Sequence, residues 1–252
     1  MRILSIDSSL GTQLAVVDAT PSAAGARALQ VLSQDEQADT RRHAESLGQM
    51  LSQALSAPEA AERPLDAVVA ATGPAPFTGL RAGLVTAGVV GRTRGVPVHG
   101  VSSLDAVARR ALDELGSHEA QTGPVVLVAT DARRREVYTA LFRANGPDDV
   151  TRLTEIIVCP PAQVAQRLAE QAPGPGGGSG GIDVVAGSGA SLYPELAEMA
   201  SYQKALAPVS GDALAQVRIA LARLERGEEL STQPLYLRHA DVQMPAARKR
   251  VR

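Results

Sequence analysis

The sequence is poor in residues that stabilise small domains covalently or bind bases by stacking. Its 252 residues include one cysteine, no tryptophan, two phenylalanines and four tyrosines. A single cysteine, Cys159, excludes an intramolecular disulfide and fits a reducing compartment. Aromatic residues make up 2% of the chain, so platforms for stacking nucleic-acid bases are scarce. The fold therefore has to come from buried aliphatic side chains, which a chain of this length can supply.

An excess of charge of one sign is also lacking, since 25 Lys and Arg stand against 27 Asp and Glu, a net charge of −2. A broad basic face that binds nucleic acid alone is not expected, and any RNA contact should be shared with a partner. No apolar run approaches the roughly 20 residues that span a bilayer. The first strand reaches Asp7 too early for a signal-peptide core. We expect a cytoplasmic protein without a membrane segment.

Ligands for a metal are sparse as well. The four histidines are His43, His99, His118 and His239, and no two lie close in sequence. A helical metal site needs two ligands on one face, such as histidines four residues apart. We therefore predict no metal site and no cofactor, and a stand-alone metallopeptidase is the least favoured function. Cys159 has no obvious base nearby and is interpreted as a buried structural thiol.

Hydrophobic periodicity predicts an α/β protein. In the first half, strands are expected at 2–7, 13–18, 28–33, 67–72 and 96–101, and helices from 43, over 79–93 and over 103–115. In the second half, strands are expected at 125–131, 136–143, 151–159 and 183–186, and helices at 161–171 and 211–225.

Both halves begin with a strand, a terminal aspartate, a turn and a second strand. The two aspartates are Asp7 and Asp131, which are 131 − 7 = 124 residues apart, about half of the chain. This recurrence indicates a duplicated domain. We predict a first lobe over 1–102, a second lobe over 103–233 with a glycine-rich linker near 173–181, and a C-terminal tail over 234–252 that ends in basic residues.

The most distinctive segment is Gly73–Leu84, which reads Gly-Pro-Ala-Pro-Phe-Thr-Gly-Leu-Arg-Ala-Gly-Leu between an expected strand and an expected helix. Three other blocks accompany it: Asp7-Ser8-Ser9, Asp131-Ala132-Arg133 with Glu136-Val137-Tyr138, and Pro234-Leu235-Tyr236-Leu237-Arg238. Together, and in their order along the chain, the blocks resemble the TsaB family, a bacterial subunit of the complex that installs threonylcarbamoyladenosine beside the tRNA anticodon. Ala75 and Pro76 depart from the glycine and serine that many members carry.

The resemblance implies a fold of two ribonuclease-H-like lobes, of the actin, Hsp70 and sugar-kinase type. It also implies a non-catalytic partner subunit that forms a homodimer when alone. In that role it would support a TsaD-like catalytic subunit, with a TsaE-like ATPase as a third member, and it would meet tRNA only through the complex.

An active member of this fold would hold metal and phosphates between an acid and a glycine-containing hairpin from each lobe. Asp7 with Gly11 and Thr12 is a candidate first half of such a nucleotide site. The segment 131–136 has no glycine that would let backbone amides close on a phosphate. We therefore predict a degenerate nucleotide site. An ATP-dependent small-molecule kinase is the alternative, and an intact second hairpin would favour it.

Small residues recur every four positions along the expected helix 79–93: Gly79, Gly83, Ala87 and Gly91. This spacing places them on one line down the helix, where another helix could approach closely. Glycine in a helix interior lowers stability by about 0.5–1 kcal/mol relative to alanine, so several such glycines need a structural explanation. We predict that the line is a subunit interface. Packing against the protein's own sheet is the alternative.

Overall fold

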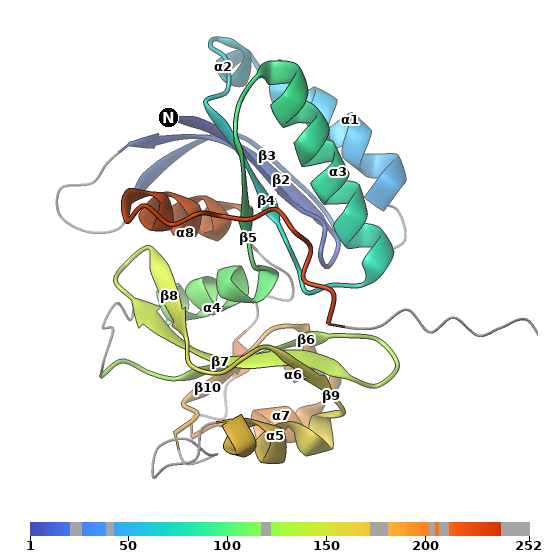
Figure 1. Cartoon of the computed structure of the whole chain (residues 1–252), viewed down its shortest axis with the longest axis vertical. Coiled ribbons are helices and arrows are strands. Elements are labelled where there is room, and N and C mark those ends of the chain that lie inside the picture. The colour runs from blue at the N-terminus through green and yellow to red at the C-terminus, as the bar shows by residue number, and fades with distance from the viewer. Residues whose placement is uncertain are drawn as a thin grey trace, which may run out of the picture.

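A computed structural model of the chain describes residues 1–20, 27–38, 43–116, 122–171, 181–201, 205–206 and 212–237. The structure consists of two α/β lobes, one above the other in Figure 1. Most of the expected glycine-rich linker, and the expected tail from residue 238 onward, lie outside the described residues. Among the described residues, no helix combines the length and apolar character needed to cross a membrane.

The first lobe contains a five-stranded sheet in the order β3-β2-β1-β4-β5. The strands are β1 (Arg2–Asp7), β2 (Thr12–Thr20), β3 (Ala28–Gln37), β4 (Ala67–Ala71) and β5 (Val98–Val101). The first three strands are antiparallel, and β4 and β5 continue the sheet parallel to β1. One face is covered by α1 (His43–Ser56) and α3 (Phe77–Arg94), with the short α2 (Pro58–Ala61) beside them.

The second lobe repeats this topology with a sheet in the order β11-β10-β6-β7-β8. Its strands are β6 (Val126–Asp131), β7 (Val137–Asn145), β8 (Asp149–Arg152), β9 (Ile157–Cys159), β10 (Val184–Ala186) and β11 (Ala205–Leu206). The single strand expected at 151–159 is split into β8 and β9, which both pair with β7. Three antiparallel strands followed by two parallel ones occur in both lobes. The predicted duplication and the predicted fold class are therefore confirmed.

The outer face of the second sheet is covered by short helices. They are η1 (Pro161–Gln163), α5 (Val164–Gln171), α6 (Ser188–Leu192) and α7 (Pro194–Ala197). Side chains such as Val164, Leu168 and Leu196 pack there against strand residues such as Leu127. Cys159 is buried in the same cluster, where burial raises the pKa of its thiol.

Two helices fill the space between the lobes. The helix α4 (Ser103–Glu114) packs on the inner face of the second sheet, and α8 (Ala213–Glu225) packs on the inner face of the first. The last helix of the chain therefore completes the core of the first lobe, although the boundaries at 102 and 233 assign it to the second. Figure 1 shows α4 and α8 as adjacent layers between the two sheets.

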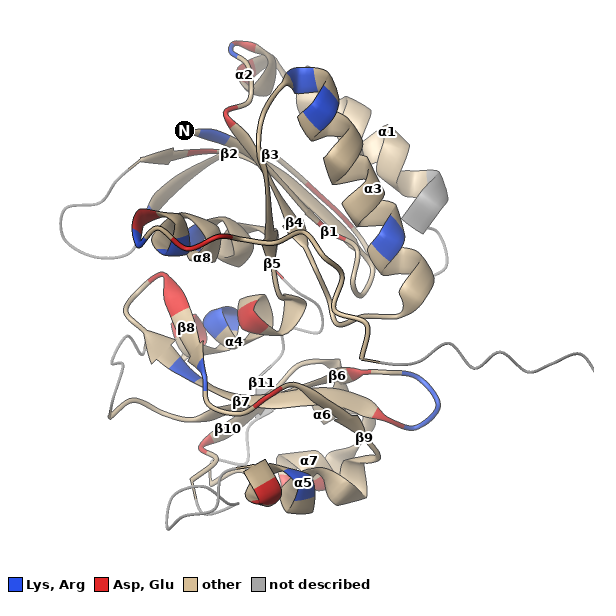
Figure 2. Ribbon diagram, viewed as in Figure 1, with Lys and Arg blue, Asp and Glu red and all other residues tan. Residues whose placement is uncertain are grey.

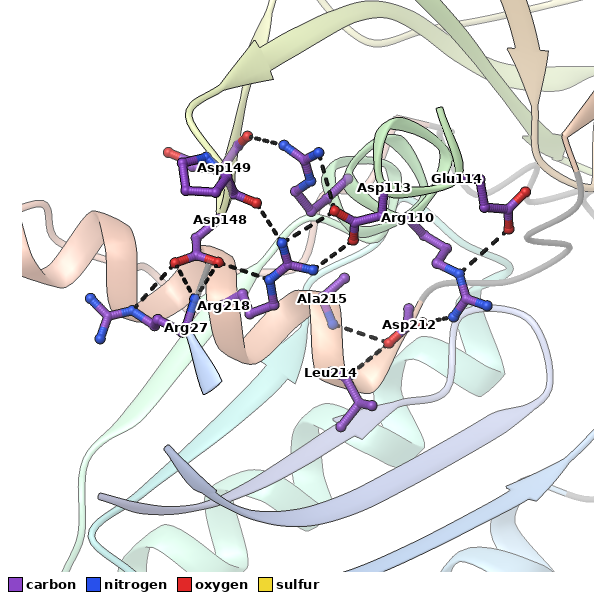
Figure 3. A network of polar contacts seen from close by, with 12 residues as sticks. Arg27, Arg110, Asp113, Glu114, Asp148, Asp149, Asp212, Leu214, Ala215 and Arg218 are labelled. Atoms are coloured by element: carbon purple, nitrogen blue, oxygen red, sulfur yellow. Dashed lines mark hydrogen bonds and ion pairs between the residues drawn. The ribbon is translucent and has the colours of Figure 1, made fainter. Parts of the chain in front are cut away.

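Ion pairs join these central layers, as Figure 3 shows. Arg218 of α8 donates to Asp113 of α4 at 2.6 Å and to Asp148, in the β7–β8 turn, at 2.9 Å. The backbone nitrogen of Arg27, in the first lobe, donates to the same Asp148 carboxylate at 3.0 Å. This network connects both lobes through one aspartate.

After α8 the chain returns as an extended segment, residues 228–237, which we name the C-terminal strap. The strap touches the edge of the first sheet, where the Gly100 nitrogen donates to the Leu230 carbonyl at 3.2 Å. Further along, the Leu235 nitrogen donates to the Thr72 carbonyl at 2.8 Å. Leu235 and Leu237 pack against the core of the second lobe. The strap therefore runs along the seam between the lobes.

Candidate functional site

Asp7, the candidate acid of a nucleotide site, lies at the end of β1 and is 3% exposed. Alternation along the strand turns Ile3, Ser5 and Asp7 toward α8, because successive side chains point to opposite faces. One Asp7 oxygen accepts from the Ser9 nitrogen at 2.8 Å and from the Ser9 hydroxyl at 2.6 Å. The other oxygen accepts from the Gln216 amide of α8 at 2.8 Å.

Gln216 is fully buried and is held from its other side, since the Ser5 hydroxyl donates to its Oε1 atom at 3.3 Å. Both oxygens of the Asp7 carboxylate therefore already accept hydrogen bonds from protein groups. Burial raises the pKa of the Asp7 carboxyl above its ordinary value of 3.8, and the nearby Asp212 adds to this, while the hydrogen bonds from Ser9 oppose it. The neutral groups of Ser9 and Gln216 therefore cover the two oxygens of this carboxyl.

The other two candidates of this site, Gly11 and Thr12, have packing roles. Gly11 has a φ of +75°, and an added Cβ would lie 2.8 Å from the Gln37 carbonyl oxygen. Thr12 is fully buried and pairs with Gln37 in the sheet. Glycine at position 11 thus follows from a left-handed turn and a close backbone approach.

The equivalent turn of the second lobe joins β6 to β7 through three arginines. Arg133, Arg134 and Arg135 have φ values of 64°, 55° and 61°, which is the left-handed region. The turn is closed by the Ala132 nitrogen, which donates to the Glu136 carbonyl at 2.9 Å. A left-handed conformation costs about 1–2 kcal/mol for each residue that has a Cβ. The conformation that glycine usually provides is therefore adopted here by three exposed arginines.

Nothing in the described residues forms a group of three or more His, Cys, Asp or Glu side chains placed to hold a metal ion. Partial burial lowers the pKa of His99. His118 and His239 lie outside the described residues, as does the side chain of His43.

The line of small residues on α3 faces inward, which corrects the expectation that it meets another subunit. Gly79, Gly83, Ala87 and Gly91 are all buried, and Ala87 belongs to the core cluster beneath the helix. A Cβ added at Gly83 would lie 2.2 Å from the Ser8 hydroxyl, and one at Gly91 would lie 2.3 Å from Val98. The small residues let α3 approach its own sheet, so the alternative of internal packing describes them.

The opposite face of α3 is exposed and partly apolar. Phe77, Val85 and Val89 are 48%, 65% and 52% exposed, and Arg81 lies on the same line of residues four apart. Figure 2 shows the middle of this helix without charge, between basic residues near its two ends. We name Phe77, Arg81, Val85 and Val89 the outer face of α3.

The strap adds a second aromatic ring to this face. The Arg81 guanidinium lies 3.6 Å from the centroid of the Phe77 ring and 5.5 Å from that of Tyr236. Its Nε atom donates to the Tyr236 hydroxyl at 2.8 Å, and the two ring centroids are 4.9 Å apart. These contacts hold the arginine in one orientation. Two of the distinctive sequence blocks, 73–84 and 234–238, thus meet on the surface.

Sequence reasoning missed Gln216 and the contact between Arg81 and Tyr236. Gln216 is a polar residue within an apolar helix, and that pattern was the available signal of a buried hydrogen-bond partner. Nothing in the local sequence indicates that Arg81 contacts both the Phe77 and the Tyr236 ring.

Residues 30–173, more than half of the chain, match a family profile described as TsaD: tRNA N6-adenosine threonylcarbamoyltransferase. The chain is 40% identical over 146 residues to an uncharacterized protein of Mycobacterium tuberculosis. That match covers 55% of this chain and 64% of the mycobacterial protein, so the similarity spans less than two thirds of the relative's length.

Two solved structures share the whole fold. One is described as an uncharacterized protein with similarity to peptidase YEAZ from Pseudomonas aeruginosa, and it superposes with a TM-score of 0.68 at 24% identity. The other is YeaZ from Pseudomonas aeruginosa, with a TM-score of 0.67 at 23% identity. Each comparison covers 94% of this chain and 99% of the other, so both lobes and their arrangement are alike.

Proposed function

This chain belongs to the TsaD family, the tRNA N6-adenosine threonylcarbamoyltransferases, and from that premise we propose that it is a non-catalytic partner subunit in tRNA threonylcarbamoylation. Its resemblance to the TsaB members is confirmed at the level of the family and of the fold. The proposed role is to bind a TsaD-like catalytic subunit, with a TsaE-like ATPase joining the complex.

The observation that carries this proposal is the outer face of α3. Aromatic and arginine side chains are enriched at the centres of protein interfaces, and exposed apolar patches mark sites of association. Here Phe77, Val85 and Val89 present apolar surface around an arginine that is already held in place by Tyr236. A preorganised side chain loses little freedom on binding. This face therefore suits a protein partner.

The buried surroundings of Asp7 support the non-catalytic part of the proposal. Both Asp7 oxygens accept hydrogen bonds within the protein, so a cation or phosphate there would have to displace the buried Gln216 amide of α8. The helix is held on the opposite side by the ion pairs of Arg218. The same geometry counts against a small-molecule kinase, the alternative function.

The proposed partners share one face. When the protein is alone, a second copy would cover the outer face of α3 and form a homodimer. The TsaD-like subunit would then replace that copy, because both would bind the same surface and only one of them can occupy it at a time. In this scheme the small residues of α3 have an indirect role, which is to fix the helix against the sheet.

The proposal is tested by placing charge on the outer face. The double variant Val85→Lys and Val89→Lys keeps good helix propensity and changes only exposed side chains, so the fold should be retained. Burying two lysines in an apolar interface should weaken binding to the TsaD-like subunit at least about tenfold. Binding is measured by titration of the purified subunits, and function by tRNA modification in a mixture with the TsaD-like and TsaE-like proteins and a threonylcarbamoyl-adenylate source.

Val31→Lys is the matched control, because Val31 is a 42% exposed valine on the edge strand β3. This control should bind and support modification like the unchanged protein. The proposal fails if the double variant pairs as tightly as Val31→Lys, or if modification proceeds equally well without this protein.

A further inference from the structure

The turn between β6 and β7 is the most concentrated exposed positive charge among the described residues. Its three consecutive arginines are exposed, in a chain whose net charge is −2. Figure 2 shows this turn as a basic loop that extends beyond the ends of β6 and β7. These residues belong neither to the outer face of α3 nor to the surroundings of Asp7.

The first of the three arginines is fixed by contacts with Asp131. Arg133 forms an ion pair with Asp131 at 3.2 Å, and its backbone nitrogen donates to the same carboxylate at 2.8 Å. These contacts hold the base of the turn. Arg134 and Arg135 lie at the tip, one and two residues further along. We treat Arg133 as a positioning residue because of these contacts. The two tip arginines are exposed, and we expect them to meet a ligand.

The left-handed backbone decides how the tip arginines are presented. In a strand, successive side chains point to opposite faces of the sheet. In a helical turn of either hand, successive residues are rotated by about 100°. The side chains of the arginines therefore point in different directions around the tip. A conformation that is unfavourable for residues with a Cβ is often retained at sites of function.

We propose that Arg134 and Arg135 bind phosphate groups of RNA. A guanidinium matches a phosphate with two parallel hydrogen bonds and stays charged at every physiological pH. A fan of two such groups fits the repeated phosphates of a nucleic-acid backbone better than an isolated carboxylate. The identity of the RNA as tRNA rests on the proposed function, whereas the phosphate chemistry rests on the turn itself.

The mode of binding follows from the surroundings. The aromatic rings that would stack on bases are absent from the turn, whose residues 132–136 are Ala, three Arg and Glu. The contact is thus to the backbone of the RNA, independent of its sequence. Two contacts give weak binding by this chain alone, which the other subunits of the complex would strengthen.

The test uses the full chain with fluorescein-labelled tRNA and follows fluorescence anisotropy between about 20 and 200 mM salt. Replacing both tip residues, Arg134→Gln and Arg135→Gln, should lower the slope of log affinity against log salt by about 1.4 to 1.8. The control pair Arg94→Gln and Arg167→Gln removes the same charge from exposed arginines elsewhere and should leave the slope near that of the unchanged protein.

A glycine pair, Arg134→Gly and Arg135→Gly, separates binding from folding, because glycine relieves the left-handed strain. It should melt at least as high as the unchanged protein and still lose the salt-dependent binding. The proposal is overturned if the unchanged protein does not bind tRNA at 20 mM salt, or if either tip variant binds like the control. It is also overturned if the tip variants lose only the TsaD-like partner. These outcomes can be distinguished from a failure of the proposed partner role, because that role is tested separately by the variants on the outer face of α3.

Discussion

At the scale of single residues, Asp7 and Asp131 have equivalent places in the two lobes, and Asp7 is the more deeply buried of the two. It ends β1 as Asp131 ends β6, and both positions begin a turn. A carboxylate that holds a cation needs access and further oxygen ligands. Asp7 instead has Ser9 and Gln216 as neutral donors and is almost fully buried. Its present role is to connect β1 with α8.

The raised pKa of Asp7 predicts a particular pH dependence of stability. Between its ordinary value of 3.8 and the raised pKa, the unfolded chain has lost this proton and the folded protein has kept it. Its contribution to stability therefore falls as the pH rises through this window, by at most about 1.4 kcal/mol per pH unit, and the loss is complete above it. Asp7→Asn should remove this decline, as measured by denaturant unfolding at a series of pH values.

Asp18→Asn is the control of opposite sign. A hydrogen bond from Arg2 lowers the pKa of the Asp18 carboxyl, so its contribution to stability is present above 3.8 and is lost as the pH falls through the lowered pKa. The Asp18 variant should be less stable at neutral pH, whereas the Asp7 variant should not. Identical pH profiles for Asp7→Asn and the unchanged protein would contradict the burial of a proton-binding carboxyl.

At the scale of elements, α3 has two faces with different tasks. The inner face carries the small residues and lies against β1, where the Ser8 hydroxyl donates to the Gly79 carbonyl at 2.7 Å. The same hydroxyl accepts from the Gly83 nitrogen at 3.0 Å. This bridge is possible only because the helix backbone comes close to the strand. The opposite side of the helix remains exposed.

Gly83→Ala and Gly88→Ala should act in opposite directions, although both place a methyl group on α3. At Gly83 the methyl carbon would lie 2.2 Å from the Ser8 hydroxyl, so Ser8 has to move. Overpacking of this kind costs about 1–3 kcal/mol. At Gly88 nothing lies within 4 Å, and the better helix propensity of alanine should add about 0.5–1 kcal/mol.

Thermal melting of the two variants provides the measurement, since 1 kcal/mol shifts the melting temperature by about 2–4 °C in a chain of this size. Should Gly83→Ala melt like the unchanged protein, the inward direction of the small-residue line would be wrong. A loss of pairing without any loss of stability would restore the subunit interface originally expected for these residues.

At the scale of the whole molecule, the lobes are joined by exchanged helices and by charge. The helices α4 and α8 each cover one sheet and contact each other, so neither lobe has a complete core without them. Arg218 connects Asp113 of α4 with Asp148 of the β7–β8 turn. A hinge between the lobes would have to break these pairs, so the network favours a fixed arrangement.

Arg218→Ala should destabilise the protein by up to about 3 kcal/mol, because it removes a shared cation from two poorly exposed aspartates. Among the described residues, Asp113 would keep only its ion pair with Arg109, and Asp148 only its contacts with Arg27. Arg110→Ala removes an ion pair with Asp212 at the same helix interface, but this arginine is 49% exposed and its loss should cost no more than about 1 kcal/mol. Chemical unfolding of both variants measures the difference. Equal losses would show that burial does not control the strength of this network.

Local patterns in the sequence were sufficient to predict the elements of the fold. Alternation and apolar runs indicate the strands that end at Asp7 and Asp131. Such patterns are informative because the side chains of any strand alternate between its two faces, wherever the strand lies in the fold. The repeat of these strands predicted the two lobes. The blocks 73–84 and 234–238 were among those that indicated the family, because a resemblance of this kind depends on local residues alone.

Contacts between distant segments could not be predicted in this way. A line of small residues defines a face of α3 but not what covers that face, and the tertiary structure turned Gly83 toward Ser8. Gln216 meets Asp7 across 209 residues, and Tyr236 meets Arg81 across 155, because α8 and the strap return to the first lobe. The sequence by itself determined which side chains share a face. Only the packing of whole elements, which is set by the summed burial of many side chains, decided which faces meet.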